Sequence, residues 1–234
     1  KALEGGKQLT RKELFARLEH EGISTQGQRG YHILSRTSLD GLLVQGVEER
    51  KDPLFMLRDE ALPNARSLSR DEALAELAQR YFLSRSPATL HDFAYWAGLT
   101  MADARVGLEG VKNQLIEETI EGERYWLPQN TEPTRGALAY APPGFDEYLL
   151  GYKVRDAVLD PAHATKVCPG KNGIFFPTIV INGRVVGTWK RTFAKGEIHV
   201  TTVPFDSISK NEMDAFINAV GRFGEFLGMP VVMA

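Results

Sequence analysis

Apolar residues recur at helical spacing near the start of the chain and then give way to short alternating stretches. Leu14 and Leu18 lie on one side of a predicted helix, and Thr10 with Glu13 forms the capping-box pattern that begins it. Gly22 is placed to end this helix, because glycine readily adopts the left-handed conformation found at helix ends. These residues predict one amphipathic helix.

A second helix is predicted within residues 28–46, with Leu34, Leu42 and Leu43 on one side. Residues 46–60 then indicate two short strands around a charged turn that contains an Asp-Pro pair. Helix, helix and hairpin, in this order, are the elements of a winged helix.

The same order of elements recurs in the next part of the chain. Ser69 caps a long amphipathic helix, and a short helix follows between Thr89 and Gly98. Thr100 caps a helix predicted over residues 101–115, and a β-hairpin then turns at a Glu-Gly pair. Either copy alone is a generic α+β segment, but two copies of one plan favour tandem winged helices.

The last part of the chain has a different pattern. Residues 129–143 combine prolines with polar residues and show no period, which indicates a linker. Apolar and polar residues then alternate around Asn182-Gly183, the pair most typical of a tight hairpin. Residues 196–205 predict a third strand, and residues 209–228 predict a terminal helix. The residues that this helix is expected to bury are Met213, Phe216, Ile217 and Val220.

The predicted fold class is therefore α+β, with three domains. Residues 1–64 and residues 65–132 are each predicted to form a winged helix. Residues 133–234 are predicted to form a β-rich domain that its terminal helix closes.

The composition is that of an ordinary globular protein, with 43% hydrophobic and 25% charged residues among 234. No apolar run approaches the roughly 18 residues that a membrane span requires, and no secretory pattern occurs. The single cysteine, Cys168, excludes an internal disulfide and fits a reducing compartment. We therefore expect a cytoplasmic protein without membrane association. The sequence begins at Lys1 rather than methionine, and we expect further residues upstream in the parent protein.

Charge is unevenly distributed, although the net charge is only −2. Residues 152–195 hold eight Lys and Arg residues against two acidic ones, which favours an acidic partner. The basic residues considered in this stretch are Lys153, Arg155, Lys171, Arg184, Lys190 and Arg191. Asn172 shares a basic turn with Lys171, and Trp189 precedes the last two, so this stretch is a candidate to cradle a nucleic-acid backbone. Basic residues that protect strand edges from aggregation are the alternative.

The predicted helix that begins near Gln28 has a basic face of its own. Arg29, His32 and Arg36 follow one another at spacings of three and four, on the side opposite the leucines. Asp40 continues the same side. This face suits contacts to phosphates and base edges, with a simple solvated face as the equally weighted alternative. The corresponding helix of the second copy mixes acidic and basic residues and is predicted to be mainly structural.

The common catalytic patterns are not found in the sequence. The stretch PGKNGIF lacks the spacing of a phosphate-binding loop, and no Gly-x-Ser-x-Gly turn occurs. The five histidines form no metal-ligand pair on one helical turn. Asp146 and Glu147 are adjacent carboxylates, which do not face a common point as an acid–base pair would. We therefore expect neither a metal nor a cofactor.

Three stretches together resemble a known family: SPATLHDFAYWAGLT, PGFDEYLLGYKVR and NGIFFPTIVINGRVVGTWKR, residues 86–100, 143–155 and 172–191. They are similar to the winged-helix DNA-binding proteins related to AlkZ/YcaQ-type DNA glycosylases, the crosslink-repair enzymes that remove alkylated or crosslinked purines. The resemblance implies tandem winged helices, a β-barrel-like domain with a C-terminal helix, and double-stranded DNA as partner. Asp146, Glu147 and Tyr148 match a family motif, and the resemblance implies that they support a substrate pocket, where a carboxylate stabilises a cationic sugar.

The resemblance also bears on the two glutamines in TQGQRGYH. In the glycosylases, catalysis is attributed to a Gln-x-Gln or Gln-x-Asp motif in an additional winged helix that lies upstream of anything matching residues 1–234. Gln26 and Gln28 instead match a later Gly-Gln segment that opens a helix. We therefore expect this pair to be the polar entrance of a helix and not the catalytic pair. A parent protein that has the upstream winged helix would be a glycosylase, whereas one without it would bind DNA without cleaving it.

The sequence thus predicts a monomer that binds duplex DNA and is part of a glycosylase-like repair protein. An alkylated purine is already a good leaving group, so its excision needs only a positioned water and a stabilised sugar cation. A winged-helix transcriptional regulator without catalytic activity is the alternative, and it would bind particular sequences, usually as a symmetric dimer. A protein-interaction module is a third hypothesis.

Overall fold

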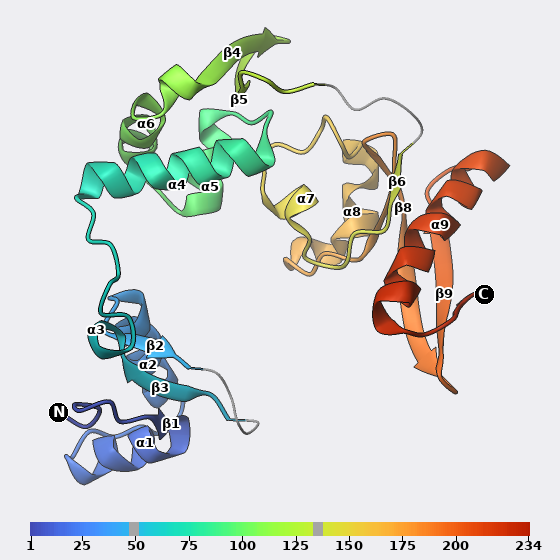
Figure 1. The fold of residues 1–234 in the computed structure, drawn as a ribbon. Coiled ribbons are helices and arrows are strands. Elements are labelled where there is room, and N and C mark those ends of the chain that lie inside the picture. Colours follow the sequence, from blue (N-terminus) through green and yellow to red (C-terminus); the bar gives the residue numbers. More distant parts are fainter. Residues whose placement is uncertain (47–51, 133–137) are drawn as a thin grey trace. The chain divides into compact units, whose positions relative to one another are not determined.

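The computed structural model describes residues 1–46, 52–132 and 138–234. These residues form two compact units, Lys1–Ser67 and Leu68–Ala234 (Figure 1). Both units mix helices with strands, as the α+β prediction requires. The finer division at residues 64 and 132 stays a prediction. Among the described residues, no helix has the length and apolar character that crossing a bilayer requires.

The first unit packs two helices against a small antiparallel sheet. Its elements are β1 (Leu9–Thr10), α1 (Arg11–His20), α2 (Arg29–Leu39), β2 (Leu43–Gln45), β3 (Leu54–Leu57) and α3 (Arg58–Ala61), with sheet order β1-β3-β2. The predicted capping box of Thr10 and Glu13 is present at the start of α1. Leu14, Leu34 and Phe55 form the buried core together with Leu3.

The second helix is shorter than predicted. It was expected to include Leu42 and Leu43, but α2 ends at Leu39. Gly41 has a φ of 72°, which a right-handed helix excludes, and the chain turns there to begin β2. Leu43 pairs with Leu57 in the sheet, so its apolar side chain serves a strand and not a helix. Most of the predicted charged turn, residues 47–51, lies outside the described residues.

The helical part of the second unit follows the predicted order. Its elements are α4 (Arg70–Arg85), α5 (Leu90–Ala97), α6 (Met101–Glu109), the 3-10 helix η1 (Lys112–Gln114), β4 (Leu115–Ile120) and β5 (Glu123–Pro128). Ser69, Thr89 and Thr100 cap the three helices, and Gly98 ends α5 in the left-handed conformation. The hairpin turns at Glu121-Gly122, both with positive φ, as predicted.

The prediction of a helix over residues 101–115 was wrong in its extent. The helix ends at Glu109, and Leu115 begins β4. Val111 and Leu115 are nevertheless buried, with 3% and 6% of their surface exposed. The helical spacing of these two residues therefore predicted their burial correctly, although not the element that carries them. The short 3-10 turn between them places both side chains in the core formed by Tyr81, Phe82 and their neighbours.

A curved five-stranded sheet covered by the C-terminal helix completes the second unit. Its order is β10 (Val231–Met233), β9 (Glu197–Pro204), β8 (Arg184–Ala194), β7 (Thr178–Ile181) and β6 (Ala139–Tyr140), with α9 (Lys210–Leu227) packed on it (Figure 1). The hairpin at Asn182-Gly183 is confirmed. Of the four residues expected to be buried on α9, Phe216 and Val220 are fully buried, and Met213 and Ile217 are half-buried.

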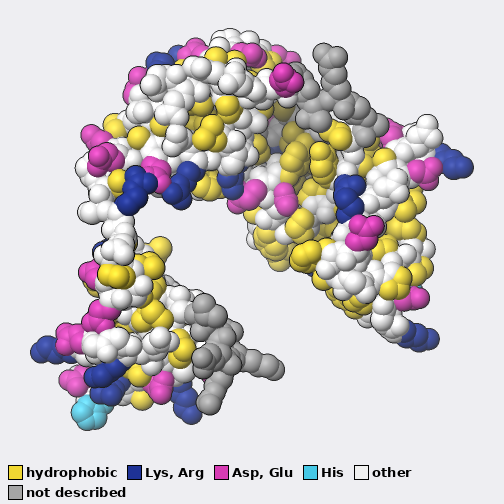
Figure 2. Space-filling view, viewed as in Figure 1, with side chains coloured by type: hydrophobic (Ala, Val, Ile, Leu, Met, Phe, Trp, Pro, Cys, Tyr) yellow, Lys and Arg dark blue, Asp and Glu magenta, His cyan; other side chains and the backbone are white. Residues whose placement is uncertain are grey.

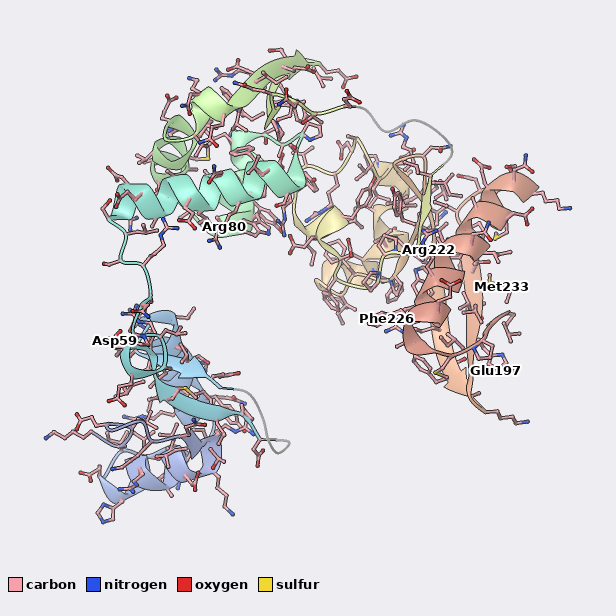
Figure 3. The ribbon with its side chains drawn as sticks, in the orientation of Figure 1. Asp59, Arg80, Glu197, Arg222, Phe226 and Met233 are labelled. Carbon is pink, nitrogen blue, oxygen red and sulfur yellow. The ribbon has the colours of Figure 1, made fainter. Side chains whose placement is uncertain are left out.

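Two strands of this sheet were not predicted. Ala139 and Tyr140 form β6 within the segment that the composition indicated as a linker. The second strand, β10, runs parallel to β9. Both strands are short. Strand β6 pairs with β7 and β10 pairs with β9, so neither is recognisable from the pattern of its own residues. Just before β10, Phe226 projects from the end of α9 (Figure 3), with 84% of its surface exposed.

A run of short helices connects β6 to β7. These are α7 (Glu147–Leu150), η2 (Pro161–His163), α8 (Ala164–Val167) and η3 (Pro169–Lys171). Leu149, Leu159 and Val167 anchor the run by packing against Val180 and Val185 of the sheet. The residues predicted from the family motif lie at the start of this run.

Candidate nucleic-acid interface

The exposed face of α2 carries the basic residues predicted for it. Arg29 and His32 are exposed, and their side chains have no hydrogen-bond or ionic partner within the described part of the chain. Arg36 donates from Nε to Asp40 Oδ2 over 2.9 Å, so its charge is partly compensated. Leu34 faces the core on the opposite side. In this unit basic and acidic side chains are interspersed on the face seen in Figure 2. On α2 itself, Arg29, His32 and Arg36 form a short basic strip.

The glutamine pair lies at the entrance of α2, as predicted. Gln28 is the residue that precedes the helix, and its side chain makes no capping hydrogen bond. Gln26 is exposed, and the intervening Gly27 has a φ of 60°. The turn is held by Thr25, whose N–H donates to Glu19 over 2.6 Å. The absence of a catalytic role for this pair stays a prediction.

The three residues of the family motif each have a structural partner. Asp146 caps α7 by accepting the N–H of Tyr148 over 2.8 Å. The Tyr148 hydroxyl donates to the carbonyl oxygen of Gly183, 2.7 Å away in the β7–β8 turn. Asp146 and Tyr148 also line a cavity of about 490 Å³ beside Tyr140. Their support of a substrate pocket stays a prediction, and the structure adds that Tyr148 attaches α7 to the sheet.

Glu147 joins α7 to the helical part of the second unit. Its Oε2 accepts from Arg85 Nε over 2.8 Å and from Trp96 Nε1 over 2.7 Å. The Arg85 guanidinium also lies 4.6 Å from the centre of the Trp96 ring. One carboxylate oxygen thus holds together α4, α5 and α7.

We expect Glu147→Ala to lower the free energy of unfolding by about 1–2 kcal/mol, because it leaves the indole N–H and a largely buried guanidinium without their acceptor. Glu147→Gln retains an oxygen acceptor and should cost less. Urea unfolding of both variants checks this, with Glu118→Ala as a matched control on the exposed strand β4. Equal stability of the Glu147→Ala and Glu118→Ala variants would contradict the bridging role.

Buried tyrosines reinforce the same junction. The Tyr81 hydroxyl donates to the carbonyl of Gly151, and the Tyr152 hydroxyl donates to the carbonyl of Arg85, each over 2.8 Å. Burial is the main cause that raises the pKa of both hydroxyls, and the nearby carboxylate of Asp92 adds to it. Both groups therefore remain protonated donors at neutral pH.

Asp92 is a residue of this junction that the sequence analysis did not single out. Its surface is only 3% exposed. Oδ2 accepts from the N–H and hydroxyl of Thr89, and Oδ1 accepts from the N–H of Lys153 over 2.8 Å and of Val154 over 3.4 Å. Thr89 was predicted to cap this helix, but the part that Asp92 takes in the cap was not predicted. The second pair of donors comes from more than 60 residues away and left no signal in the sequence.

Two predicted basic residues, Lys153 and Arg155, line one pocket. The side chain of Lys153 is exposed and has no partner among the residues that the structure describes. Arg155 is held more firmly, since its Nε donates to the carbonyl of Leu149. Its guanidinium lies 5.2 Å from the ring centre of Phe175 and 5.9 Å from that of Tyr95.

The remaining predicted residues lie in the turn before β7 and on β8. Asn172 accepts the N–H of Ile174 over 2.9 Å and so shapes its turn, while the Lys171 side chain lies outside the described residues. Lys190 is exposed on β8, and the guanidinium of Arg191 lies 5.2 Å from the ring centre of Phe223. Whether these residues contact DNA stays a prediction.

The acidic side chains of α6, Asp103 and Glu109, are each paired with a basic residue. Hydrogen bonds from Arg70 and Thr100 lower the pKa of Asp103. Glu109 pairs with Lys112 over 3.1 Å. No group of three or more His, Cys, Asp or Glu side chains in the described ranges is arranged to hold a metal ion.

The fold and these surfaces define a mixed α+β protein with an exposed basic helix face and, in the described residues, no group of side chains arranged to hold a metal ion. Residues 1–226 match the model of the family described as DNA glycosylase AlkZ-like, and the chain belongs to this family. The family predicted from three motifs is thereby confirmed.

One curated protein and one solved structure, both from Streptomyces sahachiroi, are longer than this chain and similar to it. An interstrand DNA cross-link repair glycosylase is 32% identical over 145 residues, which are 57% of this chain and 38% of that protein. The solved structure of the DNA glycosylase AlkZ superposes with a TM-score of 0.77 at 24% identity, over 98% of this chain and 66% of that one. This second likeness establishes the fold alone. The chain spans less than two thirds of either relative.

Proposed function

We propose that this chain is the DNA-binding portion of a glycosylase-like repair protein that acts on alkylated or crosslinked purines in duplex DNA. The observation that carries the proposal is the exposed row of Arg29, His32 and Arg36 on α2, within a chain of the AlkZ-like family. We further propose that the protein is a cytoplasmic monomer.

Each repeat has the elements that a winged helix needs. In the first, α1 and α2 precede the β2–β3 hairpin, and in the second, α4, α5 and α6 precede β4–β5. A winged helix places a helix in the major groove and its hairpin along the backbone. On α2, Arg29, His32 and Arg36 form an exposed basic row, whereas α6 carries the acidic residues Asp103 and Glu109 beside its basic residue Arg105. We therefore propose that α2 is the helix that enters the major groove.

We propose that Gln26 and Gln28 do not carry base excision. Gln26 and Gln28 stand at a helix entrance, which suits contact with the DNA backbone and gives no defined geometry for activating a water. The family resemblance attributes excision to an additional winged helix. The chain alone should consequently bind duplex DNA without releasing bases.

The test is fluorescence anisotropy of this chain with matched plain and alkylated duplexes at about 50 and 200 mM salt. Binding should weaken steeply with salt, because phosphate contacts release counterions, and should be tighter on the alkylated duplex. Binding that depends on sequence and ignores damage would instead support a transcriptional regulator. Weak binding that does not change with salt would contradict DNA as the partner. Light scattering of the free chain checks the monomer.

A further inference from the structure

A pocket of about 540 Å³ lies in the second unit, within residues 153–175. This volume is in the range of pockets that hold small organic ligands. The residues that give it its chemistry are Lys153, Arg155, Leu159, Thr165, Cys168 and Phe175. The family motif and the α2 face do not account for it.

The pocket has one apolar side and one cationic side. Leu159 and Phe175 provide apolar and aromatic surface, and Lys153 and Arg155 provide two positive charges. Asp156 is the one acidic residue of the described lining, so the balance remains positive. A neutral apolar ligand would leave both cations unused, whereas a small inorganic anion would leave the apolar side uncovered.

The two cations are positioned differently. Arg155 is fixed by its bond to the Leu149 carbonyl and by its contact with the Phe175 ring, so its planar guanidinium is preorganised. The backbone of Lys153 is fixed by the buried Asp92 carboxylate, while its ammonium group stays free to reach a ligand. A fixed guanidinium beside an exposed ammonium suits a phosphate group, and an aromatic ring beside a guanidinium suits a flat base.

We infer that this pocket binds a nucleotide, with its base against Phe175 and its phosphate at Lys153 and Arg155. The nucleotide has two possible sources, a free mononucleotide or a nucleotide unit of a DNA strand. Only the second source rests on the proposed function. The shared chemistry is a flat aromatic base that carries a phosphate.

Cys168 allows a direct test, because it is the single cysteine of the chain and lines the pocket. The rate of its modification by a maleimide is measured with deoxyadenosine monophosphate, deoxyadenosine, inorganic phosphate, a single-stranded oligonucleotide and a duplex. At ten times its dissociation constant a ligand that covers the thiol slows modification about tenfold. We expect the mononucleotide or the oligonucleotide to protect, and deoxyadenosine and phosphate to protect far less.

The variant Lys153→Ala should raise the concentration needed for protection about tenfold, since one charged hydrogen bond to phosphate is lost. Its exposed side chain makes the variant safe for folding, and Lys195→Ala on the β8–β9 turn changes the net charge equally and should leave protection intact. Protection by oligonucleotide but not by mononucleotide identifies a strand as the source, and protection by the mononucleotide identifies the free ligand.

Failure of this inference is distinct from failure of the proposed function. Salt-sensitive duplex binding in the anisotropy assay, together with unprotected Cys168 in every arm, would overturn the nucleotide pocket and leave the DNA-binding role standing. Protection by the mononucleotide in a chain that binds no duplex would support the pocket and remove the DNA-binding role.

Discussion

Replacing Asp92 with alanine is expected to lower the free energy of unfolding of this chain by about 3 kcal/mol. The carboxylate accepts hydrogen bonds from Thr89 and from the backbone of Lys153 and Val154 in a site that water barely reaches. Losing its part of the capping box costs about 1 kcal/mol, and the N–H groups of residues 153 and 154, left without their acceptor, add the rest. Asp92→Asn should cost nearly as much, because its amide would direct N–H groups toward other donors.

The matched control is Asp103→Ala. Asp103 stands at the same position of a Thr-capped helix, with Thr100 as its cap partner, but its other partner is the exposed side chain of Arg70. We expect it to cost about 1 kcal/mol, the value of a cap. Urea unfolding measures both variants, and hydrogen exchange of the Lys153 amide reports the lost bond directly. Equal costs for Asp92→Ala and Asp103→Ala would show that the link to residues 153 and 154 contributes nothing.

The second large effect concerns DNA affinity. The double variant Arg29→Ala and Arg36→Ala should weaken duplex binding about 30-fold at ~0.15 M salt, if each arginine contacts one phosphate. The slope of log affinity against log salt should fall by about 1.8, since each lost phosphate contact removes about 0.9. Anisotropy titrations at several salt concentrations measure both quantities.

Two further variants separate this contact from a change of net charge. Lys12→Ala with Arg17→Ala removes the same charge from exposed positions of α1 and should leave the slope almost unchanged. Asp40→Asn releases Arg36 from its ion pair and should tighten binding. If the α1 and α2 double variants lose affinity equally, the unit attracts DNA only through its charge, and α2 is not the helix that enters the major groove.

The sequence by itself determined the local elements of this protein. The capping box at Thr10, the caps at Ser69 and Thr89, and the turns at Glu121-Gly122 and Asn182-Gly183 were predicted because each depends on residues within a few positions of one another. The three family motifs were also sufficient to predict the family. The exposed side of α2 followed from helical spacing, since its buried side was marked by leucine.

Only the tertiary structure decided where two of the helices end, because the helical spacing of apolar residues continues beyond their ends. Leu43 and Leu115 both continued a helical spacing, yet both begin strands. The chain turns at Gly41 and after Glu109, and the core accepts the same side chains from a new backbone conformation. An apolar residue type at this spacing is enough to predict that the side chain is buried. Whether the residue lies in a helix or a strand depends on which part of the chain its backbone pairs with.

The candidate sites show the same division. Arg29, His32, Lys153 and Arg155 were found from charge and spacing. Their partners were not, because the bonds from Asp92 to Lys153 and from Glu147 to Arg85 and Trp96 join residues more than 50 positions apart. The strands β6 and β10 are also defined by distant partners. A sequence pattern records what one segment can do with its own neighbours, and only the folded chain brings together the groups that hold a carboxylate or enclose a pocket.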